Sequence, residues 1–193
     1  MGIKRPALKC ATVGIMAAAL ECVKLALSFI PNVEAVTLFS AVFGYCFGAL
    51  GVIASVIFVL IEPLIWGFGT WVVSYIIYWP TLTLIFALLG ARRKKKELDG
   101  DIMKERAGGA YPTSLVILVT CIAVVMTFLF GVLTSLVEVG LFSGAFDNFL
   151  FRFAIYYARG VWFYLAQIIT NLVAFPLLFV PLTRTALRIK PRV

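Results

Sequence analysis

The stretch VEAVTLFSAVFGYCFGALGVIASVIFVLI, residues 33–61, decides how often this chain crosses a membrane. A helix crosses a bilayer with about 20 apolar residues, in a range of roughly 17 to 25. The stretch has only Glu34 as a charged residue, and it is too long for one ordinary span and short for two. Three glycines, Gly44, Gly48 and Gly51, favour a break inside it. We therefore expect two short helices here.

The basic residues support that division. Most of the 17 Lys and Arg fall into three clusters. They are Lys4, Arg5 and Lys9; then Arg92, Arg93, Lys94, Lys95, Lys96, Lys104 and Arg106; then Arg184, Arg188, Lys190 and Arg192. Positive charge in short loops marks the cytoplasmic face, so an even number of spans should separate each cluster from the next. Two helices within residues 33–61 satisfy this condition, whereas one helix does not.

The sequence thus predicts an all-α integral membrane protein, a compact six-transmembrane-helix bundle with both termini in the cytoplasm (N-in/C-in). Residues 1–193 are expected to form a single domain. Its predicted helices span about 7–30, 35–48, 50–65, 71–91, 113–138 and 159–187. A basic cytoplasmic loop is expected at 92–112, and outer loops at about 31–34, 62–70 and 139–158. Pro80, Pro176 and Pro181 are expected to bend their helices.

Composition narrows the function. The chain is 63% hydrophobic and 13% charged, with a mean hydropathy of +1.06, whereas a soluble domain is nearer one quarter charged. The net charge of +8 sits at helix ends, which favours anionic lipid headgroups over nucleic acid. The sequence has no histidine and no P-loop pattern. We therefore predict no catalytic residues, no bound metal, no cofactor and no ATP hydrolysis by this chain.

Aromatic residues gather in the predicted outer half, where all four tryptophans lie. An aromatic belt at the membrane interface explains single residues of this kind, but a belt alone should populate both faces. Trp71, Tyr75 and Tyr78 have the spacing i, i+4, i+7 and therefore share one helix face. We predict that these three side chains form the wall of a ligand site.

The last predicted helix carries Tyr164, Gln167 and Asn171 at i, i+3, i+7, which also places them on one face. An unpaired amide inside a span is costly. The two amides either hydrogen-bond neighbouring helices or line a polar cavity with Tyr164. Aromatic walls with a few amides suit a planar, polar small molecule, so these three residues are predicted ligand contacts.

Charged and polar residues near the outer loops extend the candidate site. Asn32 and Glu34 are predicted loop contacts, and Arg159 is a candidate partner for a ligand carboxylate. Glu21 and Lys24 are three residues apart on the first helix, and each is expected to be the other's partner. Their pairing is either structural or part of the ligand site.

Small residues recur on the first helix at Ala7, Ala11, Gly14 and Ala18. Ala7–Ala11 and Gly14–Ala18 each have small-xxx-small spacing, which lets another helix approach closely. The approaching helix belongs either to this chain or to a partner protein.

The segment Ala26–Thr37 contains Pro31-Asn32-Val33-Glu34-Ala35-Val36-Thr37, followed by Phe43-Gly44 and Phe47-Gly48-x-x-Gly51. In these motifs, in length and in the six-helix plan, the chain resembles the substrate-binding S components of energy-coupling factor (ECF) transporters. The resemblance implies a binder of a vitamin or related micronutrient in the plasma membrane of a prokaryote. It also implies partners, namely a transmembrane coupling subunit and two cytoplasmic ATPases that use ATP.

The family's coupling motif is Ala-xxx-Ala on the inner part of the first helix. Ala7–Ala11 matches it in type, and Gly14–Ala18 replaces one alanine by glycine. The resemblance leaves riboflavin, cobalamin, folate, pantothenate, pyridoxine and a queuosine precursor open as ligands. Two other readings stay open: a membrane-embedded enzyme acting on lipid-linked substrates, and a non-transporting membrane scaffold.

Overall fold

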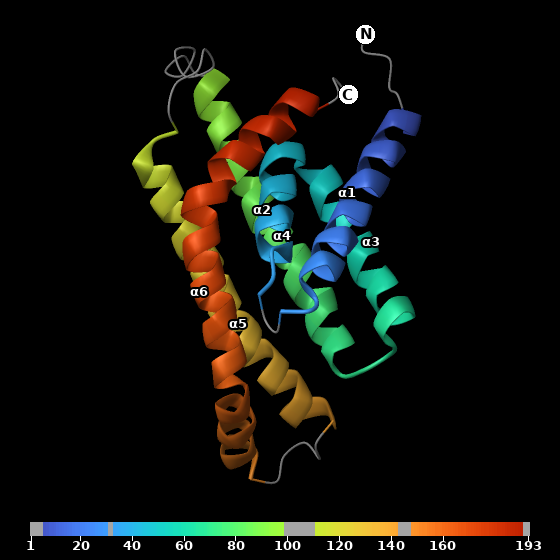
Figure 1. Cartoon of the computed structure of the whole chain (residues 1–193), viewed down its shortest axis with the longest axis vertical. Coiled ribbons are helices and arrows are strands. Elements are labelled where there is room, and N and C mark those ends of the chain that lie inside the picture. The colour runs from blue at the N-terminus through green and yellow to red at the C-terminus, as the bar shows by residue number, and fades with distance from the viewer. Residues whose placement is uncertain (1–5, 31–32, 99–110, 143–147, 191–193) are drawn as a thin grey trace.

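We describe the protein from a computed structural model, which covers residues 6–30, 33–98, 111–142 and 148–190 (Figure 1). Every regular element in this part of the chain is helical. The elements are α1 (Pro6–Leu27), α2 (Val36–Phe47), α3 (Ala49–Trp66), α4 (Trp71–Leu98), α5 (Thr113–Val137), a short π-helix η1 (Glu138–Phe142) and α6 (Phe149–Ile189). The protein is therefore all-α, as the sequence predicts.

The long apolar stretch does divide into two helices. α2 ends at Phe47 and α3 begins at Ala49, with Gly48 between them at φ 62°. This positive φ is readily available to glycine, which explains why the break falls there. Five helices, α1 and α3 to α6, are long and apolar enough to cross a membrane. α2 has only 12 residues, about 18 Å of helix, and is shorter than a bilayer core of about 30 Å.

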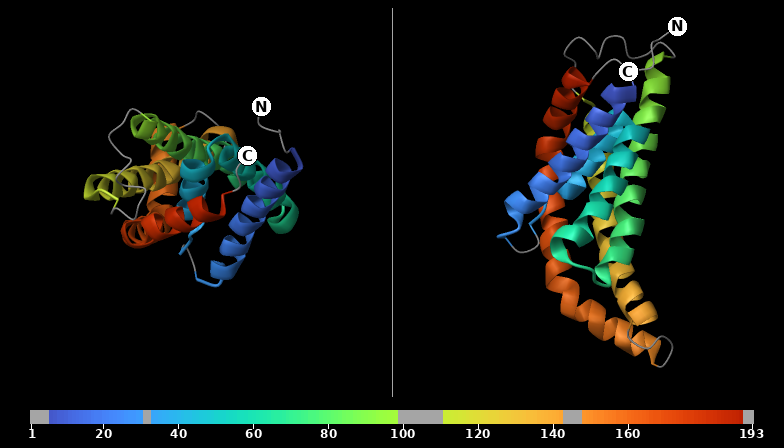
Figure 2. Two further views of the ribbon diagram at one scale, coloured as in Figure 1. Left: turned by 90° about the horizontal axis from the view of Figure 1, so that it is seen from above. Right: turned by 90° about the vertical axis from the view of Figure 1, so that its right-hand side faces the viewer.

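α2 occupies the middle of the bundle, with α1, α3, α4 and α6 around it (Figures 1 and 2). Glycines allow its backbone to approach that of α4. A Cβ atom added at Gly44 would lie 2.2 Å from the carbonyl oxygen of Thr83, and one at Gly90 would lie 2.2 Å from that of Tyr45. The two helices therefore pack backbone against backbone. Four phenylalanines complete the buried core: Phe58, Phe86, Phe175 and Phe179.

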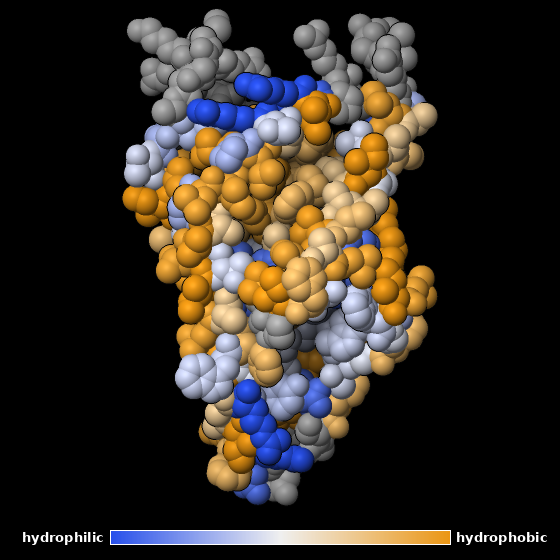
Figure 3. Space-filling view, in the orientation of Figure 1, coloured by the Kyte–Doolittle hydropathy of each residue, from blue (hydrophilic) through white to orange (hydrophobic). Residues whose placement is uncertain are grey.

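The two ends of the bundle differ. The described part of the chain begins and ends at the same end, where α4 also finishes (Figure 1). We call this the proximal end, and the opposite one the distal end. On the face shown in Figure 3, hydrophobic surface covers most of the middle between them. The exposed fractions of Ile15, 71%, and Leu177, 67%, are those of side chains that face lipid rather than a protein core.

Several predicted boundaries are wrong at the distal end. Within the predicted loop at 139–158, residues 139–142 belong to η1, which follows α5 directly, and residues 149–158 belong to α6. The rings of Phe149, Phe153 and Tyr157 stack four residues apart, with centroids 6.3 and 5.9 Å apart, which stabilises this helical start. Glu62 and Pro63 lie buried inside α3, so the predicted loop at 62–70 is shortened to the residues after Trp66.

Two further differences concern helix length. α4 continues through the basic run to Leu98 instead of ending near residue 91. The rest of the predicted loop at 92–112 lies mostly outside the described residues. α6 has 41 residues, about 60 Å of helix, and includes Pro176 and Pro181. Figure 1 shows it bending over in its C-terminal, red part, while its other end projects beyond the neighbouring helices at the distal end with α5 and η1.

Candidate functional site

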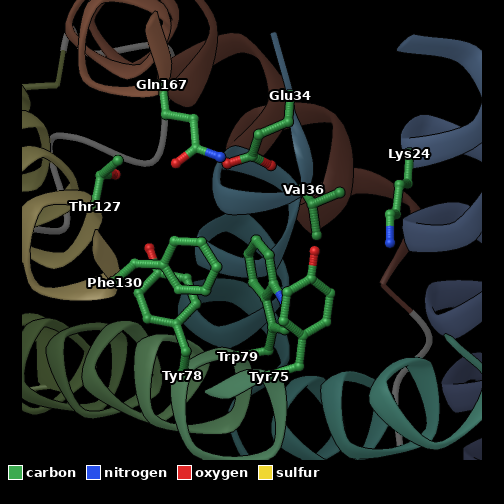
Figure 4. A pocket seen from close by; sticks show the side chains of 9 residues that line it. All are labelled: Lys24, Glu34, Val36, Tyr75, Tyr78, Trp79, Thr127, Phe130 and Gln167. Carbon is green, nitrogen blue, oxygen red and sulfur yellow. The ribbon is translucent and has the colours of Figure 1, made fainter. Parts of the chain in front are cut away.

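A cavity of about 80 Å³ lies between five helices, α1, α2, α4, α5 and α6, and the segment before α2. Figure 4 shows its lining side chains. They are Lys24 from α1, Glu34 and Val36 around the start of α2, Tyr75, Tyr78 and Trp79 from α4, Thr127 and Phe130 from α5, and Gln167 from α6. The site thus joins segments that are far apart in the sequence.

Aromatic rings form one side of this cavity (Figure 4). Tyr75, Tyr78 and Trp79 lie on one face of α4 because they are three or four residues apart. Phe130 of α5 closes the row, with its ring centroid 4.7 Å from that of Tyr78. The rings of Tyr75 and Trp79 meet edge to face at 5.8 Å. These contacts hold the rings in fixed positions and present an aromatic surface to a bound molecule.

The opposite side is polar, and Figure 4 shows Glu34 and Gln167 there, across from the rings. One oxygen of Glu34 accepts the backbone N–H of Thr37 at 3.1 Å, and the other accepts its hydroxyl at 2.5 Å. A carboxylate is favourable at this position because the N-terminus of α2 carries partial positive charge. Burial raises the pKa of Glu34, a change that these hydrogen bonds partly offset.

Gln167 differs from Glu34 in having an unused acceptor. Its Oε1 atom is buried and has no hydrogen-bond partner among the described residues. A buried carbonyl oxygen without a partner costs free energy, about 1–3 kcal/mol. A ligand donor in the cavity would remove that cost.

A groove of about 370 Å³ adjoins the cavity on the distal side of the bundle. Its lining residues are Thr70, Trp71, Ser74 and Tyr75 of the α3–α4 region, Phe130, Thr134 and Glu138 of α5 and η1, and Tyr156, Phe163, Tyr164 and Gln167 of α6. Tyr75, Phe130 and Gln167 line both spaces. Small-molecule sites commonly measure about 300–1,000 Å³, so the two together have the size of such a site.

Two glycines position Tyr164 in the groove. A Cβ atom at Gly131 of α5 would lie 2.8 Å from the Tyr164 ring, and one at Gly160 would lie 2.6 Å from it. The hydroxyl groups of Tyr164 and Thr134 are 3.3 Å apart. The ring therefore occupies a place on α5 that only glycine leaves open.

Asn171 does not line either space. It is fully buried, and its Nδ2 atom donates to the Thr127 hydroxyl at 3.0 Å. Thr127 itself lines the cavity. Asn171 therefore bridges α6 and α5 behind the site and positions Thr127. For Asn171, this is the hydrogen bond to a neighbouring helix that the sequence left open as the alternative to lining a cavity.

The predicted pair of Glu21 and Lys24 is not formed. Lys24 instead bonds to the carboxylate of Glu62 in α3. Glu21 is buried, and neither of its carboxylate oxygens has a hydrogen-bond partner among the described residues. Lys24 pairs with Glu62 because α1 packs on α3 and the fully buried Glu62 carboxylate needs a positively charged partner there.

Aromatic rings surround the Lys24 ammonium group as well. Its Nζ atom lies 5.1 Å from the ring centroid of Tyr75, 5.3 Å from that of Trp66 and 5.8 Å from that of Trp71. These are cation–π distances. Lys24 is therefore held at the cavity edge by three rings and one carboxylate.

Of the predicted ligand contacts, the structure thus gathers Glu34, Trp71, Tyr75, Tyr78, Tyr164 and Gln167 around the cavity and groove. Arg159 is exposed on α6 and lines neither, and Asn32 lies outside the described residues. Sequence reasoning did not select the α5 side chains Thr127, Phe130 and Thr134. Their spacing of i, i+3, i+7 within an apolar span was a usable signal.

The small residues of α1 face outward. Ala7, Ala11, Gly14 and Ala18 are all exposed, and a Cβ atom at Gly14 would meet nothing within 4 Å. No described helix of this chain packs on that stripe. The described residues therefore do not support the alternative in which the approaching helix belongs to this chain.

Among the described residues, no group of three or more His, Cys, Asp or Glu side chains is arranged to hold a metal ion. Comparison with family models, with curated proteins and with solved structures gave no match.

Proposed function

We propose that this protein is the substrate-binding S component of an ECF-type ABC transporter. It captures a vitamin or related micronutrient outside the cell and delivers it inward. A transmembrane coupling subunit and two cytoplasmic ATPases supply the energy. The protein sits in the plasma membrane of a prokaryote with its proximal end in the cytoplasm and its distal end outside.

The observation that carries this proposal is the cavity with its adjoining groove. The side chains around the cavity come from α1, α2, α4, α5, α6 and the segment before α2, and they combine four aromatic rings with a buried acceptor on Gln167 that has no partner among the described residues. A bundle that served only as a scaffold would gain stability by closing this space with apolar side chains. The open space favours ligand binding over a scaffold.

The exposed stripe of small residues on α1 supports the part of the proposal that concerns a coupling subunit. Lipid contacts do not require small residues, whereas close approach of another helix does. Ala7, Ala11, Gly14 and Ala18 provide a shallow surface on the helix that the resemblance assigns to coupling.

An enzyme acting on lipid-linked substrates is less well supported. Such an enzyme needs a reactive acid or nucleophile facing its substrate. Glu34 already accepts two hydrogen bonds from Thr37 at the start of α2, and Lys24 is bonded to Glu62. Both charged groups of the cavity are thus held in place by other contacts, and Glu34 keeps only acceptor positions for a ligand.

The test is to identify what the protein carries. The full chain is purified in mild detergent, denatured, and the released small molecules are identified by mass spectrometry. We expect one compound in near-stoichiometric amount, greatly reduced in the Tyr78→Ala variant and unchanged in the lipid-facing control Leu177→Ala. Co-expression with an ECF module should also yield a complex. A protein that releases no compound and joins no module would contradict the proposal.

Orientation has its own test. Single cysteines are placed at Ala91, near the proximal end, and at Phe68, in the distal loop, in a variant lacking the native cysteines. In intact cells, a membrane-impermeant thiol reagent should label Phe68→Cys and not Ala91→Cys. The reverse pattern would place the cavity on the wrong side for uptake.

A further inference from the structure

We propose that the ligand of this site is a planar aromatic cation, meaning a ring system that carries a protonated amine or a quaternary nitrogen. This inference deepens the proposed function and rests on it. It concerns the charge of the ligand, which neither the fold nor the resemblance specifies.

The first argument is the balance of charge on the lining. The charged lining residues are Lys24 and Glu34 in the cavity and Glu138 in the groove. Lys24 is already bonded to Glu62, which is fully buried behind it. Among the described residues, the lining therefore keeps two carboxylates without a basic side chain bonded to them. A cationic ligand would balance this charge, and an anionic one would add to it.

The second argument is the chemistry of the rings. At the cavity edge Tyr75, Trp66 and Trp71 already hold a cation, the Lys24 ammonium group, at 5.1 to 5.8 Å from their centroids. A second row of rings, Tyr78, Trp79 and Phe130, continues inward from Tyr75. Aromatic faces attract cations, and they stack on planar rings. A planar cation would satisfy both properties of this row.

The third argument is the supply of acceptors. Gln167 Oε1 is buried and unpaired, and Glu34 retains acceptor positions because a carboxylate offers about four and Thr37 uses two. Both lie across the cavity from the rings (Figure 4). An N–H group or a positively charged edge of a ligand fits between them. The indole N–H of Trp79 is a buried donor with no partner in the described part of the chain, so the ligand should also present one acceptor, such as a ring nitrogen.

A ligand carboxylate bonded to Lys24 is the competing arrangement. It would have to share or displace Glu62, whose buried charge would then lose its partner. That exchange is costly, because a carboxylate fully removed from water and left unpaired is strongly unfavourable.

The experiment compares three bicyclic probes of similar shape on the purified full chain at pH 8: 1-methylquinolinium, a cation; quinoline, which is neutral; and quinaldate, an anion. Binding is followed by calorimetry after any bound compound has been washed out. We expect the cation to bind about tenfold or more tightly than quinoline, and quinaldate to bind weakest. Glu34→Gln should reduce affinity for the cation about tenfold and change that for quinoline little.

The matched control is Arg152→Gln, an exposed change on α6 outside the lining, which should alter none of the three affinities. If Glu34→Gln does not fold, Glu138→Gln tests the same charge from the groove. Equal binding of the three probes, preference for quinaldate, absence of cation binding, or insensitivity to these glutamates would each overturn the inference.

These outcomes are separate from failure of the proposed function. A neutral or anionic compound released by the purified protein would overturn the inference and leave the S-component proposal intact. Release of no compound, with no association with an ECF module, would overturn the proposed function itself.

Discussion

The ammonium group of Lys24 in α1 is bonded to the carboxylate of Glu62 in α3, and not to that of Glu21 one turn earlier on its own helix. The two partners differ in burial, since the Lys24 side chain is 24% exposed and that of Glu62 is fully buried. This pair fastens α1 to α3 at the edge of the cavity.

The unequal burial predicts unequal costs of breaking the pair. Lys24→Met leaves the Glu62 charge buried without its partner and should cost about 3–5 kcal/mol of stability. Glu62→Gln leaves a lysine that still reaches water and three rings, and should cost less, about 1–2 kcal/mol. Thermal unfolding in detergent gives the order. The double variant should be more stable than Lys24→Met alone, and equal losses in the two single variants would contradict this account.

Gln167→Leu should change stability and binding in opposite directions. It removes a buried acceptor that has no partner among the residues that the structure describes, so the melting temperature without ligand should stay the same or rise. The same change should weaken binding of the co-purified compound about tenfold, because the ligand loses its partner there. Asn171→Leu is the comparison, since it breaks the hydrogen bond to Thr127 and should lower the melting temperature. A lowered melting temperature of the ligand-free Gln167→Leu protein would contradict the view that this acceptor has no partner until a ligand binds.

Gly44→Val should destabilise the bundle severely, by more than about 3 kcal/mol. Its Cβ would lie 2.2 Å from the Thr83 carbonyl oxygen, where backbone and not a flexible side chain must move. Gly14→Val is the control, because a Cβ there meets nothing within 4 Å. Melting temperatures of the two proteins in the same detergent decide the matter. Similar values would show that α2 and α4 do not depend on close approach.

Gly14→Leu and Ala18→Leu should separate ligand capture from coupling. Neither residue lines the cavity, so ligand binding should be unchanged, whereas a leucine on the stripe should prevent a partner helix from approaching. The measurement is co-purification with the coupling subunit alongside ligand content. Ala91→Leu, an exposed change on α4, serves as the control. Normal complex formation by both stripe variants would show that the coupling subunit contacts another surface of this protein.

Affinity for 1-methylquinolinium should increase with pH above 4.5, the ordinary pKa of a glutamate. Burial raises the pKa of Glu34 in the ligand-free protein, and a bound cation favours the ionised form. The cation therefore binds more tightly once Glu34 has lost its proton. The other ionisable groups lining the cavity are Lys24 of α1 and Tyr75 and Tyr78 of α4. Calorimetry across pH should show the rise in the native protein and a flatter profile in Glu34→Gln.

The sequence predicts local features of the fold well. The division at Gly48 follows from a glycine in a long apolar stretch and from the parity of the basic clusters, and both signals are contained in the chain itself. The start of α6 was missed because polar and aromatic residues around Arg152 and Tyr156 suggested a loop. Their helical conformation depends on ring stacking and on the neighbouring α5.

Partners between helices were harder to predict. Helical spacing correctly grouped Tyr164 with Gln167, but it extended the row one turn too far, to Asn171, because spacing gives the face of a helix and not the depth at which the cavity ends. Lys24 is a similar case, because the acidic residue nearest to it in the sequence, Glu21, is not the one bonded to it in the structure, Glu62. Such pairings depend on how α1 and α3 cross, which residue patterns within a single helix do not determine.

The two prolines of α6 have a mechanical consequence. Each lacks an amide hydrogen, so the carbonyl groups of Leu172 and Leu177 lose the bond that the helix would otherwise provide. This weakened joint lies between the part that carries Gln167 and the part whose last residues reach α2, where Lys190 donates to the carbonyl of Cys46 at 2.5 Å. The prolines therefore divide α6 into a distal arm, which packs along α5 and carries Tyr164 and Gln167, and a proximal arm that is anchored on α2.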